Sequence, residues 1–270
     1  MSNVILALIA SAAYSVLAIS FWRAQTRGEG DGFSRGAMGH LVLIPLVVHG
    51  YLLMQDVFAD GGFNLSMTNA LSLIVWLTLL VYAVARFFYP IGGMQALVLP
   101  LAAVIVLLPA LFPSAHQLTN TGLFAFKAHI AAAMLAYSLF TIAVLHAVLI
   151  SQVENRLHHA SMPRVLQSLP PLLTMETLLF RMIGIGFVLL TLTLGSGMVF
   201  SEEIFGKAWQ FNHKALFGFV SWCVFAVLLW GHHFYGWRGR TAVRWTVSGF
   251  VFLVLAYLGS KFVLEVILHR

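Results

Sequence analysis

The stretch "VSWCVFAVLLWGHHFYGWRGR", residues 220–240, shows the pattern on which the fold prediction depends. An apolar run leads into two adjacent histidines, a cluster of aromatic side chains and two arginines. An apolar run of about 20 residues can cross the roughly 30 Å hydrocarbon core of a membrane as a helix. Aromatic and arginine side chains commonly follow such a helix at the cytoplasmic surface. The stretch therefore predicts a transmembrane helix that ends in a positively charged loop.

The composition extends this prediction to the whole chain. Of the 270 residues, 60% are hydrophobic and 9% are charged, whereas soluble domains carry about 25% charged residues. We therefore expect an all-α, polytopic membrane bundle of about eight transmembrane helices, with residues 1–270 forming a single domain. The first span lacks the basic segment of a signal peptide and is interpreted as a retained helix. The expected spans are about residues 2–21, 38–58, 67–89, 94–113, 126–151, 177–200, 213–236 and 241–262.

The distribution of positive charge predicts the orientation of these spans. With the eight spans as drawn, ten arginines fall on one face of the membrane, and four lysines with Arg270 fall on the other. The positive-inside rule places the arginine face in the cytoplasm, so both termini are expected outside. The basic net charge is explained by these loops, and no nucleic-acid partner is expected.

Several enzyme classes find little support in the sequence. It contains no glycine-rich phosphate loop and no serine or cysteine nucleophile paired with a base, so phosphoryl transfer and hydrolysis are disfavoured. The single cysteine, Cys223, excludes a disulfide within one chain. The longest connection, roughly residues 152–176, suits a short interfacial helix broken by Pro170 and Pro171. Enzymatic activity is left open, but the sequence favours a transporter-like or chaperone-like protein.

Histidines are the residues that suggest a function. His49 falls near the middle of the second span, His129 and His146 near the two ends of the fifth, and His213 and His232 at the two ends of the seventh. At 1.5 Å per residue, the two histidines of the seventh span lie about 28 Å apart. Ionisable residues inside spans commonly mark a site or pathway, although His146 could be only an interhelical hydrogen-bond donor. Two separated polar sites are expected.

The neighbours of these histidines favour haem over a bare metal ion. Zinc and copper sites usually add carboxylates or thiolates, and the predicted membrane interior has almost none. Apolar and aromatic walls, an imidazole for iron and basic residues for the propionates would suit a porphyrin such as haem b. A membrane bundle is rich in aromatic residues in any case. His232 lies close to Arg238 and Arg240, which are candidates for binding the propionates.

Three stretches carry a resemblance to a known family. The segment from "LPPLLTMETLLF" to "GHHFYGWRGR", residues 169–240, resembles the core of the cytochrome c assembly family, which includes the CcsA, CcmC and HemX-like membrane proteins. "NLSMTNALSLIVWLTLLVYA" and "FKAHIAAAMLAYSLFTIAVL" resemble its earlier helices, so the similarity covers about residues 40–265. The chain resembles in particular the compact YpjD-like and HemX-like branch. The resemblance implies a bundle of about eight helices that binds or exports haem and that lies in the inner (cytoplasmic) membrane of a bacterium.

The family's tryptophan-rich outer loop is altered in this chain. The family pattern is Trp-Gly-x-x-Trp-x-Trp-Asp-Pro-Lys. In this chain Phe205 replaces the first tryptophan, Trp209 keeps the second and Phe211 replaces the third. Asn212 stands at the aspartate position and His213 at the proline position. Phenylalanine keeps the aromatic surface but loses the indole N–H donor. The resemblance therefore implies an outer cofactor-binding surface formed by Phe205, Trp209 and Phe211, without its carboxylate.

The resemblance also implies a set of iron ligands. His49 and His232 correspond to an intramembrane pair and His129 to one outer ligand, and only His269 is available for the other. His213 has no counterpart among the family's usual ligands and is a candidate ranked below His129. The implied function is haem handling linked to cytochrome c assembly or haem export. Its implied partners are haem, the lipid bilayer and other membrane proteins of cytochrome c assembly. The alternative is a non-catalytic regulatory or assembly protein that kept the fold and lost haem.

Overall fold

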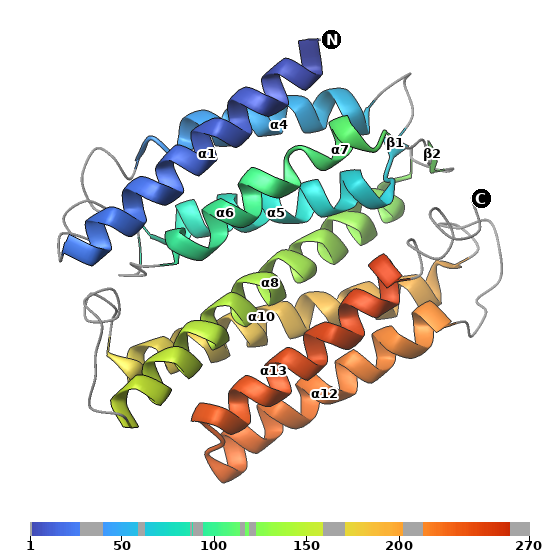
Figure 1. The fold of residues 1–270 in the computed structure, drawn as a ribbon. Helices are drawn as coiled ribbons and strands as arrows, with labels where there is room; N and C mark the ends of the chain where they lie inside the picture. Colours follow the sequence, from blue (N-terminus) through green and yellow to red (C-terminus); the bar gives the residue numbers. More distant parts are fainter. Residues whose placement is uncertain are drawn as a thin grey trace.

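The structure is a computed structural model in which the chain forms a bundle of antiparallel helices (Figure 1). The helices account for nearly all of the described chain, in agreement with its runs of apolar residues. The residues that the structure describes are 2–27, 40–58, 63–86, 88, 94–113, 117–118, 123–158, 171–201 and 213–259.

The first half of the molecule consists of the helices before residue 113. They are α1 (Ser2–Arg27), α4 (Leu43–Val57), α5 (Met67–Ala85), α6 (Gln95–Ile105) and α7 (Leu108–Leu111). Helix α1 packs against α4 and α6, and α5 packs against the same two helices from the other side. Successive long helices run antiparallel to one another, as Figure 1 shows, whereas α7 continues in the direction of α6 after a break of two residues.

The second half consists of four main helices. They are α8 (Phe124–His158), α10 (Leu172–Val199), α12 (His213–Tyr235) and α13 (Gly239–Val254), which continues as a short π-helix, η2 (Leu255–Gly259). Helix α8 packs against α10 and α13 and also against α5, so it joins the two halves. Inside this half the rings of Phe140 and Phe225 stack with their centroids 4.0 Å apart. The core of the second half is therefore filled by side chains.

The two ends of the bundle differ in character. At one end, here called the strand end, β1 (Phe63–Asn64) pairs with β2 (Gln117–Leu118) in an antiparallel ladder. The N-terminus lies at this end, and α13 points toward it (Figure 1). At the other end, here called the arginine end, α1 and α5 finish and α12 turns into α13, with Arg27, Arg86, Arg238 and Arg240 at these boundaries.

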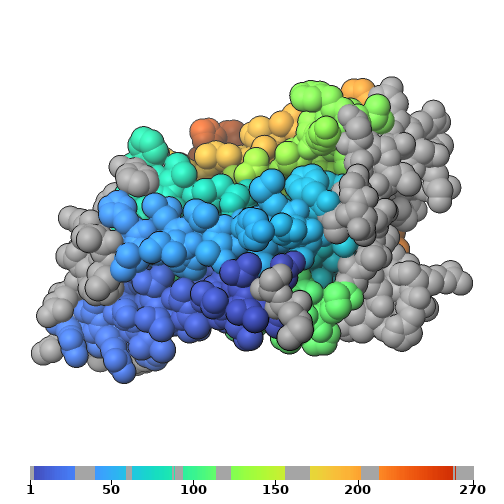
Figure 2. Space-filling model, turned by 90° about the horizontal axis from the view of Figure 1, so that it is seen from above, coloured from blue at the N-terminus to red at the C-terminus, as the bar shows by residue number. Residues whose placement is uncertain are grey.

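The predicted class, a polytopic helical membrane bundle, is confirmed. Five described helices are long and apolar enough to cross a membrane: α1, α5, α8, α10 and α12. The second and fourth predicted spans contain shorter apolar helices, and the eighth contains α13 with η2. Helices α1 and α4 occupy the middle of the face shown in Figure 2. Many of their exposed side chains are apolar, such as Val47 at 70% exposure and Val16 at 62%. Such a surface suits contact with lipid.

The main departures from the predicted boundaries lie at the longest connection. Helix α8 continues to His158 and α10 begins at Leu172, so both helices extend several residues into the predicted loop. Pro171 directly precedes the first residue of α10, where its missing N–H removes no helical hydrogen bond. The short interfacial helix was expected within the connection 152–176, of which residues 159–170 lie outside the described residues.

Candidate functional site

His49 is the most completely enclosed of the predicted site residues that the structure describes. Its side chain lies inside the first half at 1% exposure. Nε2 lies 2.8 Å from the Ser72 hydroxyl of α5, and Nδ1 lies 3.5 Å from the Tyr14 hydroxyl of α1. The three helices that surround the ring therefore each contribute one polar group to a small cluster. Both ring nitrogens face a hydroxyl, so neither is directed toward open space.

The glycine beside His49 has a packing role. A Cβ atom at Gly50 would lie 3.0 Å from Nε1 of Trp76. That indole nitrogen donates a hydrogen bond of 2.8 Å to the Leu46 carbonyl of α4. Gly50 thus lets the Trp76 ring lie flat against α4, and this contact fixes α4 on α5.

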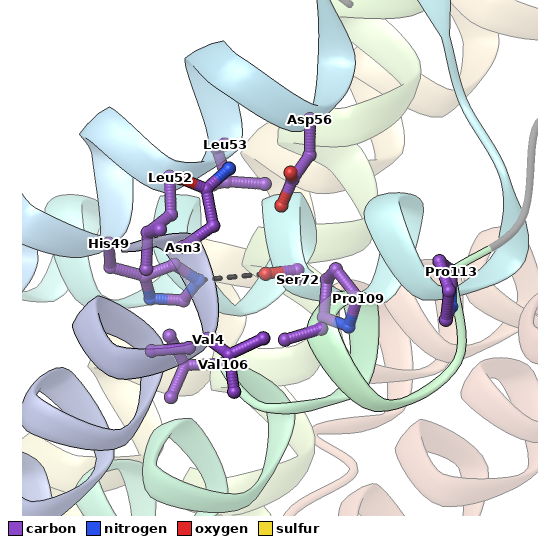
Figure 3. Close-up of a pocket in the computed structure, with 12 residues that line it drawn as sticks. Asn3, Val4, His49, Leu52, Leu53, Asp56, Ser72, Val106, Pro109 and Pro113 are labelled. Carbon is purple, nitrogen blue, oxygen red and sulfur yellow. Dashed lines mark hydrogen bonds between the residues drawn. The ribbon is translucent and has the colours of Figure 1, made fainter. Parts of the chain in front are cut away.

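A recess lies beside His49 and reaches toward the strand end (Figure 3). Its volume is about 180 Å³, and its polar lining consists of Asn3, His49, Asp56 and Ser72. Binding sites for drug-sized molecules have volumes of about 300–1,000 Å³. The recess in this conformation therefore suits water or a small ion, and a porphyrin does not fit it.

His232 lies where α12 ends, at the arginine end. Gly236, with φ of +65°, turns the chain back, and Trp237 N donates to the Gly231 carbonyl at 3.2 Å. The Trp237 ring covers Gly231 so closely that a Cβ atom there would clash with it. Nδ1 of His232 lies 3.0 Å from the Trp237 carbonyl, and its ring stacks on Phe180 with the centroids 3.4 Å apart. Because a carbonyl only accepts, Nδ1 carries the hydrogen and Nε2 carries the lone pair.

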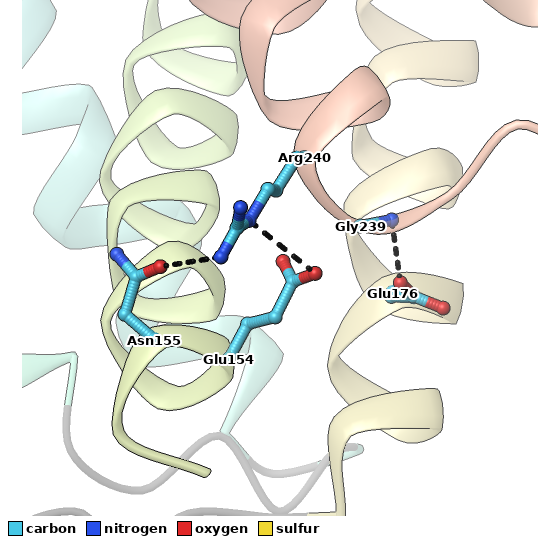
Figure 4. A network of polar contacts seen from close by, with 5 residues as sticks. All are labelled: Glu154, Asn155, Glu176, Gly239 and Arg240. Carbon is cyan, nitrogen blue, oxygen red and sulfur yellow. Dashed lines mark hydrogen bonds and ion pairs between the residues drawn. The ribbon is translucent and has the colours of Figure 1, made fainter. Parts of the chain in front are cut away.

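A network of polar contacts holds the start of α13 against α8 and α10 (Figure 4). Oε1 of Glu176, a buried residue of α10, accepts a hydrogen bond of 2.8 Å from the backbone N–H of Gly239. Arg240 donates to Oδ1 of Asn155 at 3.2 Å and lies 3.9 Å from Oε1 of Glu154. The predicted propionate ligand Arg240 is thus engaged with the protein. Glu176 supplies an N-terminal cap from a different helix.

The other predicted propionate ligand, Arg238, is exposed and immediately precedes α13. A different arginine, Arg181, lines a large cavity between the two halves. This cavity has a volume of about 410 Å³, and Tyr82, Met94, Ile142 and Phe180 also line it. Its walls are mostly apolar, and Phe180 is shared with His232. The volume falls within the range typical of binding sites for small organic molecules.

The structure does not bring His49 and His232 together. Helix α4 packs against α1 and α5, while α12 packs against α10 and α13. Figure 1 shows α4 and α12 on opposite sides of the bundle. One ring contacts Tyr14 and Ser72, and the other contacts Phe180 and Trp237. A count of residues along a helix gives the depth of a side chain but not its neighbouring helices, so the sequence could not decide this point.

His129 occupies a separate position on α8 near the strand end. Nδ1 lies 2.9 Å from the Ser196 hydroxyl of α10, and that hydroxyl in turn donates to the Thr193 carbonyl at 3.1 Å. The serine has one hydrogen to donate, so Nδ1 of His129 is the donor toward it. A Cβ atom at Gly197 would lie 3.3 Å from the histidine ring. His129 and His232 are thus at opposite ends of the second half, as the sequence predicts.

The predicted outer surface cannot be placed in the same way. Phe205, Trp209 and Phe211 lie outside the described residues, and so does His269. His213 is described as the exposed first residue of α12, at the strand end. Among the described residues, no group of three or more His, Cys, Asp or Glu side chains could hold a metal ion.

His146 is a buried residue whose environment the sequence did not reveal. It lies in α8 at 2% exposure. Nε2 lies 2.9 Å from the Met175 carbonyl, and Nδ1 lies 3.3 Å from Sδ of Met94. Met94 also lines the 410 Å³ cavity, so His146 is one side chain away from it. Of the residues around this cavity, Arg181 had a detectable signal, because an arginine inside a predicted span is costly unless it serves a site.

Comparisons with known proteins agree with this architecture. Residues 37–268 match the family model described as cytochrome C assembly protein. Inner membrane protein YpjD of Escherichia coli strain K12 is 32% identical over 265 residues, covering 97% of this chain and 99% of that protein. Cytochrome c biogenesis protein CcsA of Prochlorococcus marinus strain MIT 9312 is 40% identical over 88 residues, covering 33% of this chain and 28% of that protein.

No solved structure matches the chain. The family match nevertheless covers every described helix except α1, from before α4 to beyond η2. The relative in Escherichia coli is covered almost from end to end, and its name places it in the inner membrane. Together with the helical architecture, these matches show that the chain belongs to the cytochrome c assembly protein family.

Proposed function

We propose that this protein binds haem, as haem b, in the membrane and passes it on during cytochrome c assembly or haem export. The observation that carries the proposal is the state of His232. Its Nδ1–H is held by the Trp237 carbonyl, which leaves the Nε2 lone pair for a metal. Histidines that bind metals almost always donate their other ring N–H in this way. The ring also stacks on Phe180, which lines the 410 Å³ cavity.

The lining of that cavity supports the same proposal. Apolar walls suit a porphyrin, and the guanidinium of Arg181 can pair with a propionate as a planar, bidentate donor. We assign Arg181 this role ahead of Arg240 because Arg181 lines the cavity. We further propose that haem enters from the inner leaflet at the arginine end and leaves toward His129 and the outer aromatic segment at Phe205, Trp209 and Phe211.

The test is the absorption spectrum of protein purified gently in detergent and titrated with haem. We expect a Soret band shifted from that of free haem. His232→Ala should remove the shift, and added imidazole should restore it by filling the vacant coordination position. His233→Ala is the matched control, because His233 is adjacent but exposed, and its spectrum should be unchanged. An unchanged spectrum in His232→Ala would contradict the assignment of the ligand.

A second function is favoured by a different observation. Both ring nitrogens of His49 and of His146 are already in contact with protein groups. In a protein that kept the fold for assembly or regulation and lost haem, the buried histidines would serve only as hydrogen-bonding partners of other protein groups. The titration separates the two functions, because this alternative gives no Soret shift in the unmodified protein.

We also propose that the arginine end faces the cytoplasm and both termini face outward. The support is the excess of arginine in the loops at that end. With Cys223 replaced by serine, a cysteine at Gly30 should label from the cytoplasm and a cysteine at Asn120 from outside. Labelling with the opposite sidedness would reverse the proposed direction of entry.

A further inference from the structure

The recess beside His49 has the lining of a hydrated cavity. Asn3 of α1, Asp56 and His49 of α4 and Ser72 of α5 contribute polar groups to it, as Figure 3 shows. Asp56 lies near the end of α4 at the strand end, and His49 lies seven residues deeper, or about 10 Å along the helix. A volume of about 180 Å³ leaves room for several waters, each of which needs polar partners.

Helices α1, α4 and α5 form three walls of the recess, and the fourth wall is the interrupted helix α6–α7. Helix α6 ends at Ile105, and α7 begins at Leu108 with Pro109 in its first turn. Proline has no N–H, so residue 109 cannot donate to the Ile105 carbonyl as a continuous helix would require. Non-helical backbone at membrane depth is tolerated where it is buried in protein or lines a water-filled cavity. Val106 and Pro109 both line the recess, so the interruption lies at its wall.

The partners of His49 allow its protons to move. Its ring nitrogens face the hydroxyls of Ser72 and Tyr14. A hydroxyl can donate or accept, so either tautomer of the ring, and the protonated ring, can keep both contacts. His146 differs, because its Nε2 faces the Met175 carbonyl, which only accepts. Its ring is therefore fixed with the hydrogen on Nε2.

We propose that this recess is filled with water and gives the aqueous phase at the strand end proton access to His49. Asp56 stands at the outer part of the path and His49 at its inner end. The groups that face the ring from the neighbouring helices are Tyr14 of α1 and Ser72 of α5, and α6 with α7 contributes apolar side chains. The ligand class is water and its protons. The proposal is independent of haem binding, which concerns the cavity between the two halves.

The first experiment tests for water with a matched pair of cysteines. On a Cys223→Ser background in lipid vesicles, Val106→Cys places a thiol in the lining of the recess, and Val104→Cys places one on the lipid-facing side. Val104 lies in the last turn of α6 and Val106 directly follows it, so the two positions differ by only about 3 Å in depth. Thiolates form only where water reaches. A small charged methanethiosulfonate reagent should modify Val106→Cys at least about tenfold faster. Equal rates, or no modification of Val106→Cys, would overturn the hydrated recess.

The second experiment tests for protons. The protein is labelled with ¹⁵N-histidine, its ring signals are assigned with His49→Gln and His146→Gln, and it is transferred to D₂O in lipid. The His49 ring should exchange its proton at least about tenfold faster than His146 and should show both tautomers, whereas His146 should show one. If His49 exchanges no faster than His146, proton access is wrong even where the cysteine pair reports water. Haem titration of the same samples is unaffected by either result.

Discussion

His49 and His146 are buried to nearly the same extent, at 1% and 2% exposure, yet their surroundings differ in kind. His49 lies between two hydroxyls beside a polar recess, whereas His146 lies between a carbonyl and a thioether in the packed contact of α8 with α10. Burial requires that an imidazole be hydrogen-bonded. The identity of the partner then decides whether the ring can change its protonation or is held in one state.

The largest effect is expected where the packing is tightest. His146→Ala should lower the free energy of unfolding by about 2–4 kcal/mol, because it leaves a cavity between α8 and α10 and removes the contact with Met175. Thermal unfolding in detergent measures the loss. Val148→Ala, on the same helix but 36% exposed, should change the stability much less. Similar losses in both variants would show that the site of His146 is not specially packed.

The glycine next to His232, Gly231, is expected to give the second-largest effect. Gly231→Ala brings a methyl group into the Trp237 ring, and overpacking of this kind costs about 1–3 kcal/mol. Gly184→Ala is the control, because nothing lies within 4 Å of its added Cβ atom. The melting temperature and the Trp fluorescence of the two variants should differ. If Gly231→Ala is silent, the Trp237 fold-back is not what holds His232.

A smaller effect is expected at Ser72. Ser72→Ala removes the 2.8 Å partner of His49, and a lost interhelical hydrogen bond in membrane proteins costs about 0.6–1.7 kcal/mol. Water in the recess can replace the hydroxyl, so we expect a value near the lower limit. Thermal unfolding in detergent gives this value. A loss well above about 2 kcal/mol would mean that the recess is dry.

The smallest effect is expected at the rim of the arginine end. The Arg240 side chain is 58% exposed, and its 3.9 Å contact with Glu154 is long. Exposed ion pairs contribute about 0–1 kcal/mol, so Arg240→Ala should change the stability by less than about 0.5 kcal/mol. Glu176→Ala should cost about 1 kcal/mol in the same assay, because it removes the buried cap on Gly239. The reverse order would show that the exposed pair, and not the cap, holds the start of α13.

The structure contains a helix in each predicted span, but the sequence did not predict which helices pack against one another. An apolar run of about 20 residues indicates a membrane-spanning helix, because a helix of that length crosses the hydrocarbon core of the bilayer. The sequence also predicted that His129 and His232 lie at opposite ends of the second half, because the rise per residue fixes the depth of each side chain along its helix. The neighbourhood of Tyr14, His49 and Ser72 joins residues far apart in the chain, and no local pattern reports it.

The sequence by itself therefore determined the membrane class, the positions of the helices, the charge difference between the two ends and the family. Those properties follow from local composition and from motifs that are contiguous in the chain. Only the tertiary structure decided that His49 and His232 lie apart, that Arg240 is held by Glu154 and Asn155, and that Arg181 lines the larger cavity. Each of these contacts depends on which faces of the helices pack together, and the packing of the whole bundle determines that.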